Sequence, residues 1–115
     1  MPGWHVPTIA EWDSLANAVG GTSVAGTRLK ALDGAADGSW PTGWNGADEF
    51  GFAAFPAGYY NGSFNDLGSY ANFWTATEYD SSLAYLRHFE TGSSMYSYNN
   101  DKSRGYSVRL VKDSA

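Results

Sequence analysis

The chain has 115 residues and a formal net charge of −5, and its aromatic and charged residues each make up 17%. This length suits a single domain over residues 1–115, and the many rings predict an aromatic core. The negative charge and the lack of a Lys/Arg cluster argue against nucleic acid and anionic membranes as partners. Because the chain has no cysteine, disulfides, thiolate nucleophiles and Cys-ligated metals are excluded.

No apolar run approaches the length of a membrane span, so we expect no membrane insertion. Met1-Pro2-Gly3-Trp4 does not resemble a signal peptide. If the parent protein is secreted, its export signal therefore lies outside this chain.

A first helix is predicted to begin at Thr8. Thr8 and Glu11 have the spacing of a capping box, in which each side chain accepts a hydrogen bond from the other's backbone amide. An apolar stripe follows and Gly20-Gly21 supplies the stop. The stripe consists of Ile9, Trp12, Leu15, Ala16 and Val19. We interpret Glu11 as a capping residue rather than a catalytic acid, and His5, which has no patterned partner, as structural.

A second, shorter helix is predicted to run to Leu32, capped by Thr22 or Ser23. The residues expected to face the core are Val24, Leu29 and Leu32. Those expected to face solvent are Arg28 and Lys30. Gly26 costs a helix about 1 kcal/mol relative to alanine, so we expect another backbone to pack closely there.

The segment from Asp33 to Glu49 is predicted to be a long surface loop fixed by Trp40 and Trp44. Its calcium-ligand candidates are Asp33, Asp37, Asp48 and Glu49. Their spacing does not match an EF-hand loop, so we predict a solvated loop and no metal site. Phe50–Pro56 then predicts a buried strand, and Ala57–Phe64 a hairpin with a type I′ turn at Asn61-Gly62.

Two further strands are predicted, over Phe73–Tyr79 and Gly105–Val111. Glu78 lies on the same face of the predicted strand as Trp74 and Ala76. A carboxylate held against an apolar core needs a partner. The first candidate is Arg109 and the second is Arg87. If that pair is buried, removing Glu78 should cost about 3 kcal/mol. Helices followed by short strands predict an α+β domain.

Between these strands the chain is rich in Tyr, Ser, Asn and Asp, a composition typical of antibody binding loops. The candidate ligand-binding residues are Tyr85, His88, Glu90, Ser93, Tyr96, Tyr98, Asn99, Asn100 and Asp101. We expect Tyr96, Tyr98, Asn99 and Asp101 to be accessible to solvent. Both tyrosines should carry most of the affinity, and replacing both with serine should leave folding nearly intact.

Four ordered motifs give the chain a family resemblance from Gly3 to about Asp113. They are Gly3-Trp4-His5-Val6-Pro7-Thr8-x-x-Glu11-Trp12, Gly51-Phe52-Ala53-Ala54-Phe55-Pro56-Ala57-Gly58, Phe73-Trp74-Thr75-Ala76-Thr77-Glu78 and Gly105-Tyr106-Ser107-Val108-Arg109. The chain resembles the Fibrobacter succinogenes major paralogous domain of bacterial surface proteins. That resemblance implies a C-type lectin-like fold, with two helices packed on a small, mostly antiparallel sheet with long loops.

This sequence departs from the family pattern twice. Members usually carry tens of residues before the first motif, so this chain is either a shortened natural version or an excised fragment. The cysteine often found before the final valine is Leu110 here. The same branch includes formylglycine-generating enzymes, which depend on active-site thiols that this chain lacks.

The branch also includes variable proteins of diversity-generating retroelements, whose C-terminal segment is rewritten at adenines. The corresponding positions here include the candidate ligand-binding residues and Leu86. A reverse transcriptase gene beside a near-copy of the Phe73–Val111 coding sequence would identify this chain as one of them. The composition fits the idea, although other family members have Tyr/Asn-rich segments too.

Three functions follow as hypotheses. The first is a non-enzymatic module that binds a protein or carbohydrate through its C-terminal third, on a cell surface, outside the cell or on a phage particle. The second is a structural repeat of a bacterial surface protein without a ligand, and the third is an enzyme like the formylglycine generators. The residues show no nucleophile–base pair, so we favour the first and expect neither a cofactor nor a catalytic residue.

Overall fold

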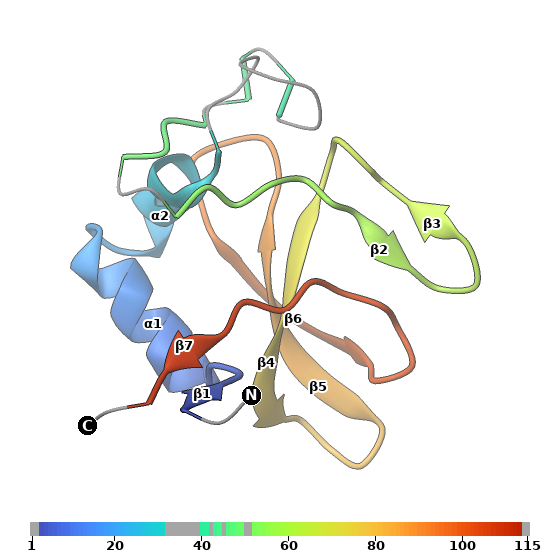
Figure 1. Ribbon diagram of the computed structural model, residues 1–115. Helices are drawn as coiled ribbons and strands as arrows, with labels where there is room; N and C mark the ends of the chain where they lie inside the picture. Colours follow the sequence, from blue (N-terminus) through green and yellow to red (C-terminus); the bar gives the residue numbers. More distant parts are fainter. Residues whose placement is uncertain (1–2, 32–39, 42, 45, 50–51, 114–115) are drawn as a thin grey trace.

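The computed structural model describes residues 3–31, 40–41, 43–44, 46–49 and 52–113. This part of the chain forms two helices and several small antiparallel sheets, which confirms the predicted α+β class (Figure 1). The elements are β1 (Trp4–His5), α1 (Ile9–Ala18), α2 (Thr22–Leu29), β2 (Tyr59–Tyr60), β3 (Phe64–Asn65), β4 (Ala71–Glu78), β5 (Leu83–Phe89), β6 (Tyr96–Asp101) and β7 (Val111–Lys112). Neither helix is long and apolar enough to cross a membrane.

The central sheet is antiparallel, in the order β4-β5-β6. Two short pairs complete the architecture: β1 pairs with β7, and β2 pairs with β3. The helices lie on one side of the central sheet, and the β2–β3 hairpin projects on the other (Figure 1). Because side chains alternate along strands, each face of the sheet has its own chemistry.

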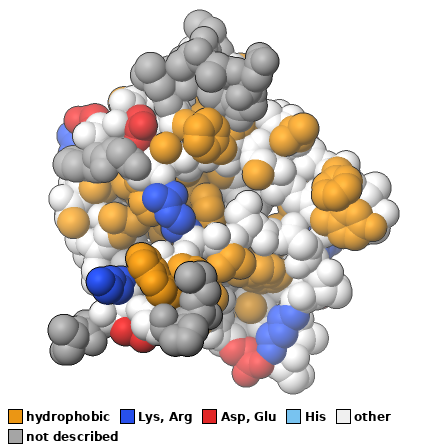
Figure 2. Space-filling view, in the orientation of Figure 1, with side chains coloured by type: hydrophobic (Ala, Val, Ile, Leu, Met, Phe, Trp, Pro, Cys, Tyr) orange, Lys and Arg blue, Asp and Glu red, His pale blue; other side chains and the backbone are white. Residues whose placement is uncertain are grey.

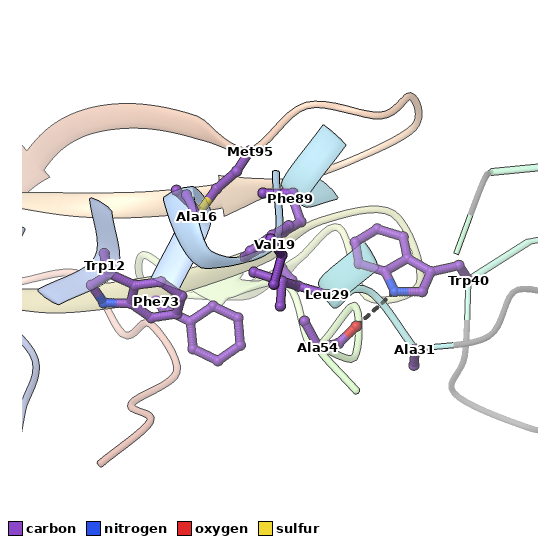
Figure 3. Close-up of a cluster of buried hydrophobic side chains, with 12 residues drawn as sticks. Trp12, Ala16, Val19, Leu29, Ala31, Trp40, Ala54, Phe73, Phe89 and Met95 are labelled. Atoms are coloured by element: carbon purple, nitrogen blue, oxygen red, sulfur yellow. Dashed lines mark hydrogen bonds between the residues drawn. The ribbon is translucent and has the colours of Figure 1, made fainter. Parts of the chain in front are cut away.

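The face toward the helices carries the aromatic core. Trp12 of α1 packs against Phe52, Phe73 and Phe89, with ring centroids 5.8, 5.5 and 6.5 Å away. Trp40 is fully buried and donates its indole hydrogen to the Ala54 carbonyl at 2.7 Å (Figure 3). The predicted aromatic core is thus confirmed, as is the role of Trp40 as an anchor.

Helix α1 begins with the predicted capping box. The Glu11 amide donates to the Thr8 hydroxyl at 3.2 Å, and the Thr8 amide donates to the Glu11 carboxylate at 3.0 Å. Trp12 and Ala16 are buried on the apolar face. The prediction for His5 was incomplete, because its ring lies between Asp113, at 2.6 Å, and Glu11, at 2.8 Å.

Helix α2 differs from its prediction at both ends. Gly21, at φ 106°, takes the N-cap position, and neither Thr22 nor Ser23 caps the helix with a side chain. The helix ends at Leu29, and Leu32 lies outside the described residues. The expected close approach at Gly26 is confirmed, since a Cβ there would lie 2.2 Å from the Ser94 carbonyl oxygen.

Lys30 is fully buried, which contradicts its predicted exposure. Its Nζ donates to the carbonyl oxygens of Trp44 at 2.5 Å, Glu90 at 2.6 Å and Gly92 at 2.8 Å. The helical spacing that predicted exposure does not apply, because the backbone of Lys30 is extended. The ammonium therefore connects the end of α2 with Trp44 and with the segment 90–92.

The segment before the hairpin is less regular than predicted. Phe50 and Gly51 lie outside the described residues, and within 52–56 a single bridge joins Ala54 to Lys30. Ala53, at φ 53°, interrupts the alternation that a strand needs. The β2–β3 hairpin is present, but its connection has three residues, 61–63, and only Gly62 has a positive φ. The predicted type I′ turn, which needs two central residues that both have a positive φ, is therefore wrong.

The predicted strand over Gly105–Val111 is replaced by bridges at Gly105 and Ser107, followed by β7. The predicted Glu78–Arg109 pair is also wrong. Glu78 is exposed and pairs with Lys102, because its face of β4 turns away from the helices. Arg109 instead donates to the Phe52 carbonyl at 2.7 Å, and buried Arg87 pairs with Asp13 at 3.0 Å.

Candidate functional site

A cavity of about 310 Å³ lies on the face of the central sheet opposite the helices. We call it the tyrosine cavity. Strands β4, β5 and β6 supply its floor and one side, while Tyr59 of β2 and the segment 104–106 close another side. Its lining residues are Tyr59, Tyr70, Asn72, Leu86, His88, Glu90, Tyr98, Asn99, Asn100, Arg104 and Tyr106.

The strand register explains why these residues meet. His88 lies opposite Asn72 on β4 and opposite Tyr96 on β6. One step along, Leu86 lies opposite Trp74 and Tyr98. Cross-strand neighbours on one face have Cβ atoms about 5 Å apart, so the two rows form a continuous surface.

A hydrogen-bonded row crosses the cavity wall. His88 Nδ1 lies 2.6 Å from Asn72 Oδ1, and His88 Nε2 lies 2.8 Å from Glu90 Oε1. Both contacts are satisfied together when each ring nitrogen carries a hydrogen. Burial nevertheless lowers the pKa of His88, and this outweighs the hydrogen bond and charge of Glu90, which raise it. The neutral ring has a single hydrogen, so it can donate to only one of these oxygens.

Tyrosine rings surround this row. Tyr70 and Tyr98 meet the His88 ring edge to face, at 4.7 and 5.4 Å. Tyr96 stacks on Tyr98 with centroids 6.2 Å apart and planes 8° apart, extending the surface beyond the cavity. Glu90 and Asp66 raise the pKa of Tyr70, so its hydroxyl stays protonated at neutral pH. The rings therefore present apolar faces next to the hydrogen-bonded row, and the Tyr70 hydroxyl is neutral.

The segment 104–106 holds the remaining wall in place. Gly105 and Tyr60 exchange backbone hydrogen bonds of 2.7 and 2.8 Å, and a Cβ on Gly105 would lie only 3.0 Å from that of Tyr60. The guanidinium of Arg104 lies 5.8 Å from the centre of the Tyr59 ring. Tyr106 packs against Trp74 at 4.6 Å. The cavity wall thus combines a cation with an aromatic surface.

The structure brings together part of the predicted binding set. The predicted residues that border the tyrosine cavity are His88, Glu90, Tyr98, Asn99 and Asn100, and Tyr96 adjoins them. Tyr85 instead packs on Tyr79, Ser93 is exposed in the β5–β6 connection, and Asp101 ends β6. The predicted exposure of Tyr96, Tyr98, Asn99 and Asp101 is confirmed.

Sequence reasoning missed the other half of the cavity. The missed residues are Tyr59, Tyr70, Asn72, Arg104 and Tyr106. Asn72 could have been predicted from the sequence, because it lies two residues before Trp74 and therefore on the same face of β4, away from the core. The others lie on the short strand β2 or in irregular segments, and no local pattern marks them as site residues because distant contacts bring them to the cavity.

Metal ligation has no support in the described part of the chain. No group of three His, Cys, Asp or Glu side chains comes together there. Asp33 and Asp37 of the acidic loop lie outside the described residues. Asp48 accepts from the Ala53 amide at 3.0 Å, and Glu49 pairs with Arg28 at 3.2 Å. These two carboxylates therefore have structural partners.

We predict that the two histidines titrate on opposite sides of their ordinary pKa of 6.5. Hydrogen bonds to Asp113 and then Glu11 raise the pKa of His5, whereas burial lowers that of His88. The stability contributed by His5 is complete below pH 6.5 and is lost as pH rises through its raised pKa. That of His88 is complete above pH 6.5 and falls as pH drops toward its lowered pKa.

The measurement is an NMR titration of the two imidazole signals, assigned with His5→Gln and His88→Gln. His88 titrating above pH 6.5 would contradict the account, because it would mean that Glu90 outweighs burial and holds the ring charged.

Comparison with known proteins gives one result. Residues 2–112 match the family model described as the Fibrobacter succinogenes major domain. No curated protein and no solved structure matches the chain.

Proposed function

The chain belongs to the Fibrobacter succinogenes major domain family, and we propose that it is a non-enzymatic module that binds a protein or glycan ligand. The tyrosine cavity and the adjoining Tyr96 ring form the proposed binding surface. The observation that carries the proposal is that a cavity of about 310 Å³ brings four tyrosine rings together with the polar or charged side chains of Asn72, His88, Glu90, Asn99, Asn100 and Arg104. Ligand sites typically have this composition and begin near this volume.

Two observations favour binding over catalysis. His5 is held by two carboxylates, and His88 is held by a carboxylate and an amide. Neither imidazole is hydrogen-bonded to a described serine or threonine hydroxyl, which it would activate in a nucleophile–base pair. The alternative of a structural repeat without a ligand lacks an equivalent observation in its favour.

We also propose the finer family assignments as part of this function. A C-type lectin-like arrangement agrees with helices on one side of a small sheet and a binding surface near the C-terminus. Retroelement diversification agrees with the exposure of β6, where side chains can change without disturbing the aromatic core. A location outside the cell, on the cell surface or on a phage particle would suit a ligand-binding module.

The test replaces both Tyr96 and Tyr98 with serine. We expect loss of binding to whichever immobilised glycans or displayed peptides the unmodified protein retains. The stacked rings are 36% and 49% exposed, so their loss should cost about 1 kcal/mol of stability. This cost exceeds the sequence-based expectation of near-intact folding, because the rings also pack on His88.

The matched control is Tyr79→Ser. Tyr79 is 54% exposed and packs on Tyr85 at 5.6 Å, away from the tyrosine cavity. It should lose a similar aromatic contact and keep binding. If the double variant binds as well as the unmodified protein, the tyrosine cavity and the adjoining Tyr96 ring are excluded as the binding site.

A further inference from the structure

We propose that the tyrosine cavity binds one neutral sugar ring, held by hydrogen bonds that adjacent ring hydroxyls form with the Asn72 amide and donate to the Glu90 carboxylate. The inference rests on the proposed function and names its ligand class. The cavity, at about 310 Å³, lies at the small end of the range for ligand sites. It therefore suits a single monosaccharide unit better than a folded protein segment.

Asn72 provides the first observation. Its side chain lies in the cavity wall and is only 4% exposed. His88 contacts one end of the amide, Oδ1, and the other end, Nδ2, has no hydrogen-bond partner in the described structure. Turning the amide, as a neutral His88 that donates to Glu90 requires, leaves Oδ1 without a partner instead, so one end of the amide is unpaired in either case. A buried amide hydrogen without an acceptor is unfavourable, and such groups usually have a partner. An oxygen atom of a ligand entering the cavity would supply that partner.

Glu90 provides the second. One carboxylate oxygen, Oε1, is hydrogen-bonded to His88 Nε2, while the side chain remains 31% exposed. Oε2 is therefore able to accept from a ligand. A hydroxyl group can accept from Asn72 and donate to Glu90 at once, because it carries a hydrogen and two lone pairs. Adjacent hydroxyls on a sugar ring provide several such groups at fixed spacing.

The charges of the cavity oppose a charged ligand. Glu90 repels a carboxylate, which has no hydrogen to donate to Oε2. Arg104, on the opposite side of the cavity, repels an ammonium group, which in turn cannot accept from Asn72. A neutral ligand that both donates and accepts satisfies all of these groups.

The tyrosine walls suit the remaining surface of a sugar. The face of an aromatic ring is electron-rich, so it attracts the weakly positive C–H groups on one side of a pyranose. The rings of Tyr70 and Tyr98 both contact His88, next to the polar row. Hydroxyl groups and C–H groups of one ligand would thus each meet matching chemistry.

The test is an NMR titration of the ¹⁵N-labelled chain with glucose, galactose, mannose and N-acetylglucosamine. Acetate and tetramethylammonium serve as anionic and cationic probes. We expect at least one neutral sugar, at millimolar concentration, to shift the Asn72 side-chain amide and the backbone amides of His88 and Tyr98. Neither charged probe should do so.

Two variants sharpen this result. Glu90→Gln should weaken sugar binding about tenfold, because a hydrogen bond to a charged acceptor is replaced by a weaker one. The glutamine side chain keeps an acceptor for His88. If Glu90→Gln folds poorly, Tyr98→Ser tests the aromatic wall of the cavity independently. Glu78→Gln is the matched control, since Glu78 is exposed and does not line the cavity. Its sugar affinity should be unchanged.

Shifts of the cavity amides by acetate or tetramethylammonium, and not by sugars, would overturn the ligand class. Absence of sugar-induced shifts, together with binding of a peptide that the Tyr96/Tyr98 double variant loses, would refute the sugar and leave the proposed function standing. If no probe, glycan or peptide binds, both proposals fail.

Discussion

Replacing Lys30 with methionine is expected to lower the free energy of unfolding by about 3 kcal/mol or more. The ammonium is fully buried and donates to the carbonyl oxygens of Trp44, Glu90 and Gly92. Methionine keeps most of the apolar stem and removes the donor. Each buried carbonyl that loses its partner costs about 1–3 kcal/mol, partly offset because a charged group no longer has to be desolvated.

Urea denaturation of the Lys30→Met variant measures this loss. Lys102→Met is the control, because Lys102 is exposed and its ion pair with Glu78 should contribute at most about 1 kcal/mol. Equal unfolding midpoints for Lys30→Met and the unmodified chain would contradict the structural role assigned to this ammonium.

The second large effect is expected from Gly26→Ala. In an open helix this change would stabilise the protein by about 1 kcal/mol. Here the new Cβ would lie 2.2 Å from the Ser94 carbonyl oxygen and 2.6 Å from its carbon. Both atoms belong to backbone, so α2 and the segment 93–95 must separate. We therefore expect a destabilisation of about 1–3 kcal/mol, opposite in sign to the helix propensity.

The same variant should disturb the proposed binding surface. The Thr27 amide donates to the Ser93 carbonyl at 3.2 Å, and the Met95 amide donates to the Thr22 carbonyl at 2.9 Å. These bonds position the chain directly before Tyr96, the first residue of β6. Ser23→Ala, on the exposed side of α2, is the control and should be neutral or slightly stabilising. A more stable Gly26→Ala variant would show that the two backbones do not pack as described.

Local patterns in the sequence predicted the start of α1 correctly, but they were wrong for the α2 cap and for the turn of the β2–β3 hairpin. The capping box of α1 depends on residues three positions apart, and the polar composition of the segment that forms β6 predicted its exposure to solvent. The close contact of another backbone with Gly26 could also be predicted, because a glycine inside a helix is unfavourable unless close packing requires it.

Long-range partners could not be predicted in the same way. His5 meets Asp113 across 108 positions, and Lys30 is buried only because carbonyls from residues 44, 90 and 92 converge on it. The Glu78 error has a related cause. Alternation placed Glu78 and Trp74 on one face correctly, but the period alone does not say which face meets the helices.

The tyrosine cavity combines both situations. One wall comes from β5 and β6, whose composition indicated binding, and the other comes from Tyr59 and the segment 104–106. That second wall depends on the backbone pairing of Gly105 with Tyr60, a contact between β2 and an irregular segment far away in the sequence. Sequence reasoning therefore identified the residues on and next to β5 and β6, and missed Tyr59, Tyr70, Asn72 and the segment 104–106.

Two other surfaces compete for a ligand and make the account testable. A smaller, mostly apolar cavity of about 150 Å³ lies between α1, Phe52 and Arg109. The β2–β3 hairpin exposes Tyr60 and Phe64, and hydrophobic side chains are prominent at its projecting end (Figure 2). Neither surface includes a residue of the hydrogen-bonded row formed by Asn72, His88 and Glu90.

The most direct measurement is a chemical-shift map of the ¹⁵N-labelled chain with the ligand that binds best among the immobilised glycans and displayed peptides. The account predicts that the largest shifts cluster on Asn72, His88, Glu90 and Tyr98, around the tyrosine cavity. Shifts that cluster instead on Trp12, Leu15 and Val111, or on Tyr60 and Phe64, would place recognition elsewhere and contradict the central claim.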